Sequence, residues 1–480
     1  MEKRVAKNFI IYSLPDILAK CIFFLTMPIT TLYLTTEDFG YITLFTLCSV
    51  PFTILVEFGA GYIINSTWFK FSRKQQRELL FNLLAISALM NFLAVIIVTA
   101  FYNRIFPILV GGNWEAIKSL YWVLILKVLF GIPTGVFMSW VIIEQKAKLS
   151  SIIQIINIIL TAGVTILAVI LTGSYKYVIL GNVAVFIVVS LIQIMVMFSS
   201  IEFRFRYEYF KLAYEVGGPI FLRSIFNQIR KQVDTFYVAK LFGAGQLALY
   251  DFPKRFDSMF AGITANYDKS YEPFIYKQLS ERGLLISNLR RVLFFWFYVT
   301  FLLSSVLFVF GRQLIILFTH GVFGNSYPLL LLILCVVFVR ATFAGTPLVL
   351  VYYQKTKYIF FATLIHGILS IFLCVILVKL YGAKGGVVAI WAGTFVYFFI
   401  NFLLKRKLCP EPFIEKITWP YVLIFHLLVV LKVFFNTDIP MTVFFVLIVI
   451  LTIHGYLREK KYLRGVFNKG IKIFWTIKTS

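Results

Sequence analysis

The sequence predicts an all-α integral membrane protein with about fourteen transmembrane helices, arranged as two six-helix lobes around a central cavity plus two C-terminal helices. Apolar residues fill 60% of its 480 positions, and the mean hydropathy is +0.88. So little polar surface could not cover a soluble fold of this size, and a lipid bilayer is therefore the expected solvent. The formal charge of +25 would suggest nucleic acid as the partner of a soluble protein. Here the basic residues gather in short loops at alternating chain reversals, which indicates membrane orientation and no nucleic acid.

Fourteen apolar stretches are long enough to cross a bilayer, which takes about 20 helical residues. They cover residues 9–34, 40–65, 79–101, 118–143, 150–172, 178–199, 212–241, 246–275, 289–311, 326–353, 357–380, 383–404, 418–436 and 439–457. Several are longer than a bilayer is thick, so we expect tilted, kinked or protruding helices. The loops between them are too short to form a soluble domain.

The distribution of basic residues predicts the orientation. They are concentrated at the N-terminus, in every second loop and in the tail from Arg458, and are sparse in the other loops. Both termini are therefore expected in the cytoplasm, which fits an even number of spans. The tail mixes basic and aromatic residues and could lie on the anionic inner leaflet; the alternative is that it only fixes the topology.

Thirteen ionisable side chains interrupt the apolar stretches. The basic ones are Lys20, Lys127, Arg223, Arg230, Lys231, Lys254, Arg255 and Arg340, and the acidic ones are Asp16, Glu57, Asp234, Asp251 and Asp257. A charge in the middle of a bilayer costs about 2.5–3.5 kcal/mol even on lenient scales, whereas a folded protein has only roughly 5–15 kcal/mol of net stability. Most of these groups must therefore face water or one another. We expect a polar cavity, and its basic excess fits an anionic cargo.

The seventh span carries the clearest pattern. Arg223, Asn227, Arg230 and Asp234 follow one another at steps of four, three and four residues, so they share one face of a helix. Such a helix could lie on the membrane surface instead, but the topology needs this segment to cross. The eight basic residues are our candidates for substrate binding. For any single one, a salt bridge that only holds helices together is the alternative.

Four acidic residues, Glu57, Asp16, Asp234 and Asp257, are candidates for ion coupling. Glu57 has no evident partner on its own helix, and desolvation favours the neutral form of a buried carboxylate, so it could exchange a proton. The alternative is a hydrogen bond between helices. The five cysteines follow no paired or metal-ligand spacing. With no nucleotide-binding loop or nucleophile motif in the chain, we expect no catalytic residue, metal or cofactor.

A weak internal repeat predicts the domain organisation. Spans one and seven each have an early proline (Pro15 and Pro219), later polar residues, and a following helix that begins near a tyrosine (Tyr41 and Tyr250). The repeat predicts lobes at residues 1–211 and 212–404, an accessory helix pair at 405–457 and a basic cytoplasmic tail at 458–480. Two lobes that meet at a cavity are a usual plan for transporters.

Several segments resemble a known family. The stretches 36–41, 218–220, 234–237, 249–250 and 271–275 are similar to the polysaccharide (O-antigen or capsule) flippases of the multidrug/oligosaccharidyl-lipid/polysaccharide exporter superfamily. The resemblance implies alternating-access transfer of undecaprenyl-pyrophosphate-linked oligosaccharide across the bacterial inner membrane. It also implies membrane lipids as surroundings, and a polysaccharide polymerase or chain-length machinery as candidate contacts. The cationic cavity agrees, because pyrophosphate binding needs arginine or lysine.

Three alternatives stay open. A multidrug exporter of the same superfamily takes mainly cationic drugs and would be expected to have an acidic cavity. A membrane polymerase or ligase would need a large outer loop with catalytic residues, whereas the longest outer loops, 102–117 and 312–325, contain few ionisable groups. A channel is harder to separate, although the repeat favours alternating access. The sequence leaves open the sugar, the kind of polysaccharide, the driving ion and the oligomeric state.

Overall fold

The computed structural model describes residues 2–280, 285–353, 355–408 and 415–435, together with 449, 450 and 453. The chain is all-α, as predicted: every regular element in these residues is a helix. Eight of the described helices or helix segments are long and apolar enough to cross a membrane. The chain divides into two compact units, which we call unit 1 (residues 1–251 with 317–323) and unit 2 (residues 252–316 with 324–480). The predicted lobes at 1–211 and 212–404 stay a prediction.

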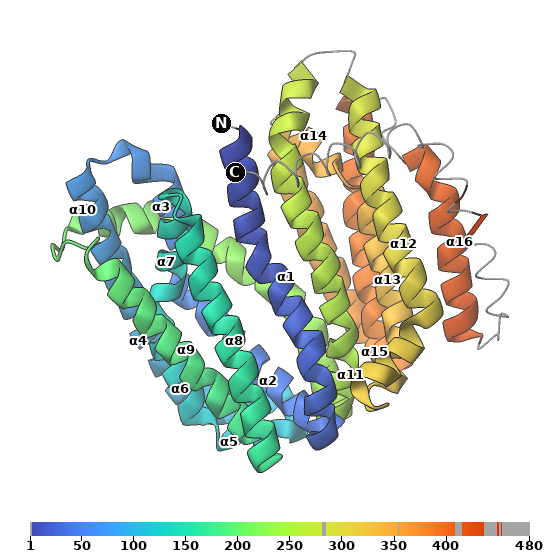
Figure 1. Ribbon diagram of the computed structural model, residues 1–480, viewed down its shortest axis with the longest axis horizontal. Helices are drawn as coiled ribbons and strands as arrows, with labels where there is room; N and C mark the ends of the chain where they lie inside the picture. Colours follow the sequence, from blue (N-terminus) through green and yellow to red (C-terminus); the bar gives the residue numbers. More distant parts are fainter. Residues whose placement is uncertain are drawn as a thin grey trace, which may run out of the picture. The chain divides into compact units, whose positions relative to one another are not determined.

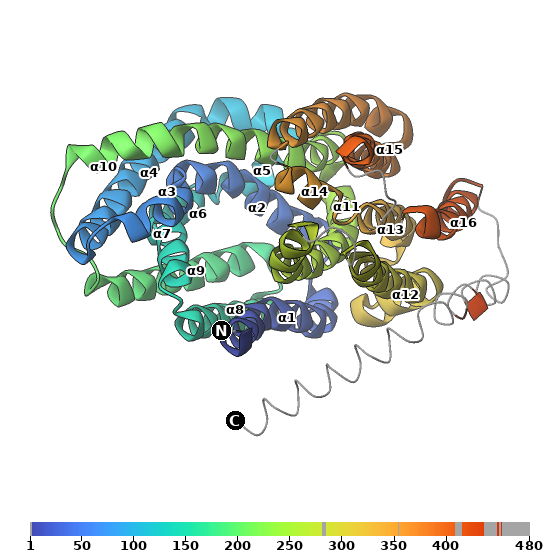
Figure 2. The ribbon, with the colours of Figure 1, turned by 90° about the horizontal axis from the view of Figure 1, so that it is seen from above.

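Unit 1 is built from long helices joined by short turns. Its elements are α1 (Glu2–Tyr33), α2 (Thr36–Glu57), α3 (Ala60–Thr67), η1 (Trp68–Lys70), α4 (Arg73–Val110), η2 (Gly111–Asn113), α5 (Trp114–Lys118), α6 (Tyr121–Leu129), α7 (Ile132–Ile143), α8 (Ala147–Thr172), α9 (Tyr175–Phe198), α10 (Tyr207–Leu212), the π-helical turn η3 (Ala213–Gly217) and the first part of α11 (Gly218–Ser280). Helix α8 lies between α1 and α9, as Figures 1 and 2 show. In the described residues, two large clusters of buried apolar side chains and a small third one form the core of this unit.

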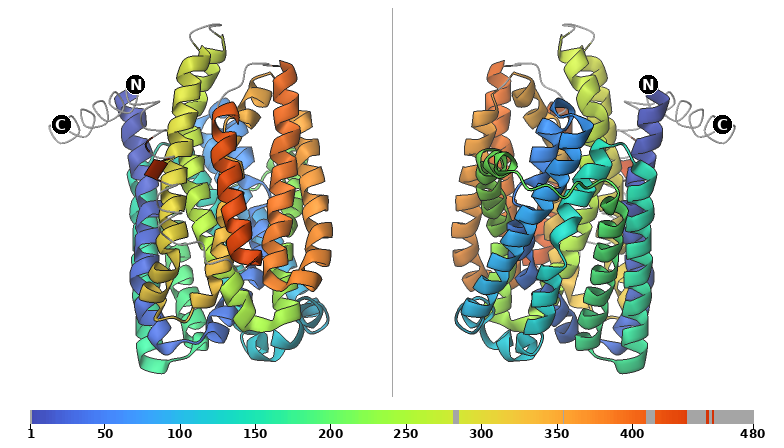
Figure 3. Two further views of the ribbon diagram at one scale, coloured as in Figure 1. Left: turned by 90° about the vertical axis from the view of Figure 1, so that its right-hand side faces the viewer. Right: turned by 90° about the vertical axis from the view of Figure 1, so that its left-hand side faces the viewer.

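Unit 2 contains the rest of α11, and helix α12 (Leu285–Thr319) begins in it. The other elements are η4 (Gly324–Ser326), α13 (Tyr327–Thr342), α14 (Thr346–Tyr352), α15 (Thr356–Leu408) and α16 (Glu415–Phe434). Helix α13 is buried almost throughout and packs against α15 and α16. The Phe338 and Phe425 rings stack with centroids 4.2 Å apart, and Trp391 donates a hydrogen bond to His426 Nε2 at 3.0 Å. These contacts join α16 to α13 and α15, and Figure 3 shows α16 (red-orange) and α15 (orange) running roughly parallel to each other.

The helices interrupt three of the predicted spans. Span 40–65 breaks at Phe58 and Gly59, span 118–143 at Phe130 and Gly131, and span 326–353 at residues 343–345. Gly59 and Gly345 have φ angles of +73° and +82°, in the left-handed region that glycine adopts without steric cost. The lengths of the spans predicted kinks, but the sequence pattern did not predict where the helices break.

Two helices instead combine two predicted spans each. Helix α11 covers spans 212–241 and 246–275, with a non-helical residue at Gly243 (φ 81°, ψ 178°). Helix α15 covers spans 357–380 and 383–404, with a similar break at Gly382 (φ 61°, ψ −145°). Span 418–436 corresponds to α16. Except for residues 449, 450 and 453, span 439–457 lies outside the described residues, as does the predicted tail at 458–480.

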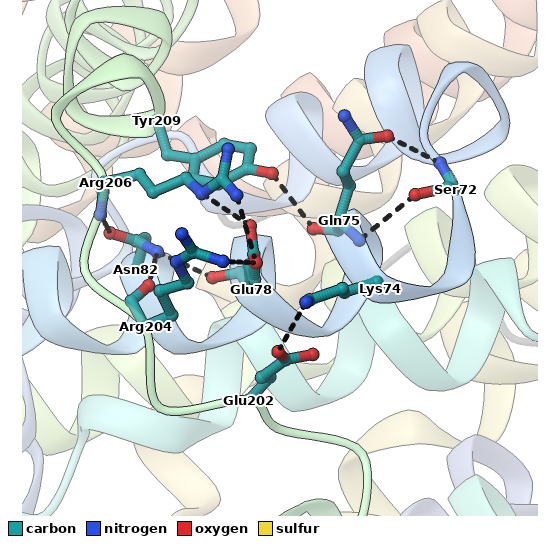
Figure 4. Close-up of polar contacts among 9 residues, drawn as sticks. All are labelled: Ser72, Lys74, Gln75, Glu78, Asn82, Glu202, Arg204, Arg206 and Tyr209. Carbon is teal, nitrogen blue, oxygen red and sulfur yellow. Dashed lines mark hydrogen bonds and ion pairs between the residues drawn. The ribbon is translucent and has the colours of Figure 1, made fainter.

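An ion-pair cluster fixes the segment after α9 to the start of α4 (Figure 4). The Glu78 side chain is fully buried, and its Oε2 lies 2.8 Å from Arg206 Nε while its Oε1 lies 3.7 Å from Arg204 Nη1. Asn82 accepts a hydrogen bond from the Arg206 backbone N–H at 3.0 Å and donates one to the Arg204 carbonyl at 2.8 Å. Burial, and then the charge of Glu78, raises the pKa of the Tyr209 phenol, which donates to the Gln75 carbonyl. The cluster therefore holds the segment just before α10 against the start of α4.

Candidate functional site

The twelve candidate residues are distributed over both units. Unit 1 holds Asp16, Lys20, Glu57, Lys127, Arg223, Arg230, Lys231 and Asp234, and unit 2 holds Lys254, Arg255, Asp257 and Arg340. The side chains of Glu57 and Arg223 lie outside the described part of the structure, so their roles stay predictions.

In unit 2 the structure brings Arg340 and Asp257 together. Arg340 lies near the C-terminal end of α13, and Asp257 lies on α11. The guanidinium donates two hydrogen bonds to the carboxylate, Nη1 to Oδ1 at 3.0 Å and Nη2 to Oδ2 at 3.4 Å. Both side chains are partly exposed, 26% and 29%, so the pair is not sealed in the core. This fork geometry is the one in which arginine also binds phosphate.

In unit 1 the corresponding cation is Lys127, in the last turn of α6. Its ammonium donates a hydrogen bond to Ser49 Oγ on α2 at 2.9 Å and lies 5.8 Å from the centroid of the Phe45 ring. Ser49 in turn donates to the Thr46 carbonyl at 2.7 Å, so its oxygen is free to accept from the lysine. Among the described side chains, Lys127 has no carboxylate in ion-pair contact. The desolvated ammonium is therefore not neutralised by a described acid.

The polar face predicted for span seven lies in the first part of α11. Lys231 is exposed, Arg230 is partly exposed and Asp234 is buried. The Tyr250 hydroxyl donates a 2.5 Å hydrogen bond to Asp234 Oδ2, which joins the two sides of the break at Gly243. A buried carboxylate with such a partner also has a structural role, which competes with the predicted role in ion coupling.

In the remaining candidates, Asp16 is exposed on α1 and Lys20 is partly exposed one turn later. Lys254 and Arg255 are partly exposed on α11. A groove in unit 1, between α6, α8 and α9, is lined mainly by apolar side chains such as Trp122, Leu126 and Leu167, and it contains none of the candidates. The residues that line it include no basic side chain.

Sequence reasoning missed the polar partners. Ser49 and Tyr250 lie in apolar segments and Glu78 lies just before one, and only the fold brings them to Lys127, Asp234 and Arg206. A signal existed for Glu78, since it lies a few residues after a basic loop at the start of an apolar span. Within the described residues, no three histidine, cysteine, aspartate or glutamate side chains gather in a way that could hold a metal ion.

Comparison with solved structures places this fold among membrane transporters. The chain is similar to the lipid II flippase MurJ in an inward closed conformation, with a TM-score of 0.72, 15% identity, and coverage of 95% of this chain and 100% of that one. It is also similar to a multidrug resistance MATE transporter in an inward-facing conformation (TM-score 0.63, 14% identity, 84% and 97% covered). A transporter from Pyrococcus furiosus, described as having a binding pocket of reversed polarity, gives a TM-score of 0.59 at 14% identity, with 84% and 95% covered.

These identities are low, so the likeness concerns the fold, which is that of the transporter superfamily to which the solved proteins belong. The family is shown by the sequence itself. A family model described as "Polysaccharide biosynthesis protein" matches residues 5–267, more than half of the chain, and the protein belongs to that family. No curated protein matches the sequence. The expected family is therefore confirmed, and the eight apolar helices indicate a multi-pass membrane protein.

Proposed function

We propose that this protein is a flippase that moves undecaprenyl-pyrophosphate-linked oligosaccharide repeat units across the bacterial inner membrane for O-antigen, capsule or exopolysaccharide synthesis. The observation that carries the proposal is the unbalanced cation at Lys127, held between α2 and α6 with a serine as its hydrogen-bond partner. A partly buried ammonium without a described counter-ion is costly unless an anionic ligand neutralises its charge. A pyrophosphate on a lipid carrier supplies that anion at membrane depth.

Broken helices next to the cations support the same function. Lys127 and Arg340 each lie three residues before a break in a predicted span, at Phe130 and Phe343. A break frees backbone polar groups, which are tolerated at membrane depth only inside the protein or beside a water-filled cavity. In secondary transporters, discontinuous helices of this kind form substrate sites. The transfer we propose is therefore alternating access, with the phosphates and sugars in the polar interior and the prenyl chain left in the lipid.

The orientation follows from the basic loops. With both termini in the cytoplasm, the basic loop at residues 70–77 lies on the cytoplasmic side, where lipid-linked repeat units are made. The protein then acts as a transporter rather than an enzyme. A polysaccharide polymerase or the chain-length machinery, which uses the delivered units on the outer side, is a candidate partner.

Reconstitution tests the proposal against its main rival. The full-length protein is placed in vesicles that contain a fluorescent undecaprenyl-pyrophosphate-linked oligosaccharide, and a membrane-impermeant quencher reports the fraction in the outer leaflet. We expect faster transfer than in protein-free vesicles, and no uptake of the cationic dye ethidium. Dye transport without lipid transfer would identify a multidrug exporter instead. If the correctly folded protein has neither activity, the proposed flippase function is wrong.

A further inference from the structure

A helix break follows α6 in unit 1 and α13 in unit 2, and the two breaks have the same backbone hydrogen-bond pattern. In the break after α6, Phe130 N–H bonds to the Leu126 carbonyl, and Gly131 N–H bonds to the Val128 carbonyl. In the break after α13, 213 residues later at each position, Phe343 N–H bonds to the Val339 carbonyl, and Ala344 N–H bonds to the Ala341 carbonyl. Each bonding pattern lies within one unit. The same pattern also ends α7, at Glu144 and Gln145. The two breaks are related by their spacing of 213 residues, which is close to the 209 residues between Tyr41 and Tyr250 of the predicted repeat.

A cation precedes each break at the same distance. Lys127 lies three residues before Phe130, and Arg340 lies three residues before Phe343. Each side chain turns to the helix that follows the first span of its repeat, Lys127 to α2 and Arg340 to the second part of α11. Their partners, Ser49 and Asp257, are separated by 208 residues, five fewer than the two cations. The repeat has kept a cation facing a polar group in both units.

The charge balance of the two pairs differs. Asp257 neutralises Arg340 through two hydrogen bonds, of 3.0 and 3.4 Å. Ser49 offers Lys127 one neutral oxygen at 2.9 Å, and the nearby Phe45 ring offers only its π-face. An ammonium has three donors, so the described contacts of Lys127 leave capacity for an anion. The guanidinium of Arg340 can bind an anion only after it has released the Asp257 carboxylate.

We propose that Lys127 and Ser49 form a phosphate-binding subsite that is ready in the unliganded protein, and that Asp257 holds the equivalent cation Arg340 in reserve. This inference rests on the proposed function and assigns unequal roles to its two lobes. The diphosphate is captured at Lys127, and Arg340 binds phosphate only when Asp257 no longer occupies the guanidinium. Because the two cations differ in this way, the diphosphate binds to Lys127 first and to Arg340 later in the transfer.

The test exchanges the partner side chains. Binding of inorganic pyrophosphate to the purified full-length protein in detergent is measured by titration calorimetry at constant ionic strength. Lys127→Met removes a charge-assisted contact and should weaken binding about ten- to a hundred-fold, and Lys127→Arg should retain most of it. Ser49→Asp gives unit 1 the acidic partner of unit 2 and should weaken binding by a similar factor. Lys118→Met, which removes an exposed lysine outside the site, is the matched control and should bind normally.

The reverse exchange tests Arg340. Asp257→Ser should tighten pyrophosphate binding about tenfold, and adding Arg340→Met should cancel that gain. Elution volume and unfolding midpoint show that each variant is folded, and a variant that fails this check is replaced by Lys127→Gln or Asp257→Asn. Normal binding by folded Lys127 variants, or unchanged binding after Asp257→Ser, would overturn the inference. If the wild type flips lipid-linked oligosaccharide and these variants bind normally, the proposed function stands and only the subsite is refuted. If the wild type neither binds pyrophosphate nor flips lipid, both fail.

Discussion

Replacing Arg206 with alanine tests the ion-pair cluster that fixes α10 to α4. The Glu78 side chain has no exposed surface, and its nearest cation is Arg206 Nε at 2.8 Å, on a side chain that is 33% exposed. Removing this partner strands a buried carboxylate, which costs about 3–5 kcal/mol when both partners are buried. Because Arg206 is partly exposed, and because Arg204 remains 3.7 Å away, we expect about 2–3 kcal/mol. Asn82 still binds the backbone of residue 206, so the loop keeps its main-chain contact.

Removing Glu78 should cost less stability than removing Arg206, and this difference tests the reasoning. Glu78→Gln leaves two arginines without their carboxylate, but these side chains are 33% and 55% exposed and can turn to water. The glutamine variant should therefore lose about 1 kcal/mol, less than Arg206→Ala. Arg204→Ala should also cost about 1 kcal/mol or less, because the side chain is more exposed and farther from Glu78. In the double variant Glu78→Gln with Arg206→Ala, part of the loss should be recovered, since no buried charge is left unpaired.

Thermal unfolding of the purified protein in detergent measures these differences. At roughly 2–4 °C per kcal/mol for a unit of about 250 residues, Arg206→Ala should lower the midpoint by about 5–10 °C. Lys74→Ala is the matched control, because Lys74 is 62% exposed and lies 3.8 Å from Glu202 in the same cluster. Its midpoint should change by no more than about 3 °C. A larger loss for Glu78→Gln than for Arg206→Ala would refute the reasoning, since attraction within the pair would then outweigh the stranded anion.

Three further predictions concern packing, cargo and coupling. Gly40→Ala should cost about 3 kcal/mol or more and lower the abundance of the protein in the membrane, because an added Cβ would lie 2.0 Å from the Ala244 carbonyl oxygen. Gly245→Ala is the control and should be tolerated, because its added Cβ would have contacts of 3.5 Å or longer. Equal abundance of the two variants would contradict this packing. Arg230→Ala should lower lipid transfer about ten- to a hundred-fold in the vesicle assay, and Arg230→Lys should keep part of the activity. Normal transfer by the Arg230→Ala variant would show that Arg230 has only a structural role. Glu57→Gln, which mimics the protonated state, should abolish any response of transfer to an imposed pH gradient; a full response would remove Glu57 from the coupling mechanism.

The sequence by itself determined the solvent of this protein, its fold class and its family. Hydropathy averaged over about 20 residues identifies membrane-spanning helices. A segment that crosses a bilayer must satisfy its backbone N–H and C=O groups by hydrogen bonds within itself, and it must expose no unpaired charge to lipid. The stretch at 234–237 and the others like it likewise indicated the family before any contact was known. The list of charged residues in the spans was also available from the sequence, because such charges stand out against an apolar background.

The tertiary structure decided which of these charges have partners. Lys127 and Arg340 look alike in the sequence, yet one meets a serine and the other a carboxylate. The breaks beside them were also decided in three dimensions, because a glycine or proline permits a break but packing determines whether the helix uses it. The Glu78 contacts join residues more than 100 positions apart, so no local pattern could have specified them. Local periodicity shows which residues share one face of a helix. The side chains that this face contacts depend on how distant segments pack against it.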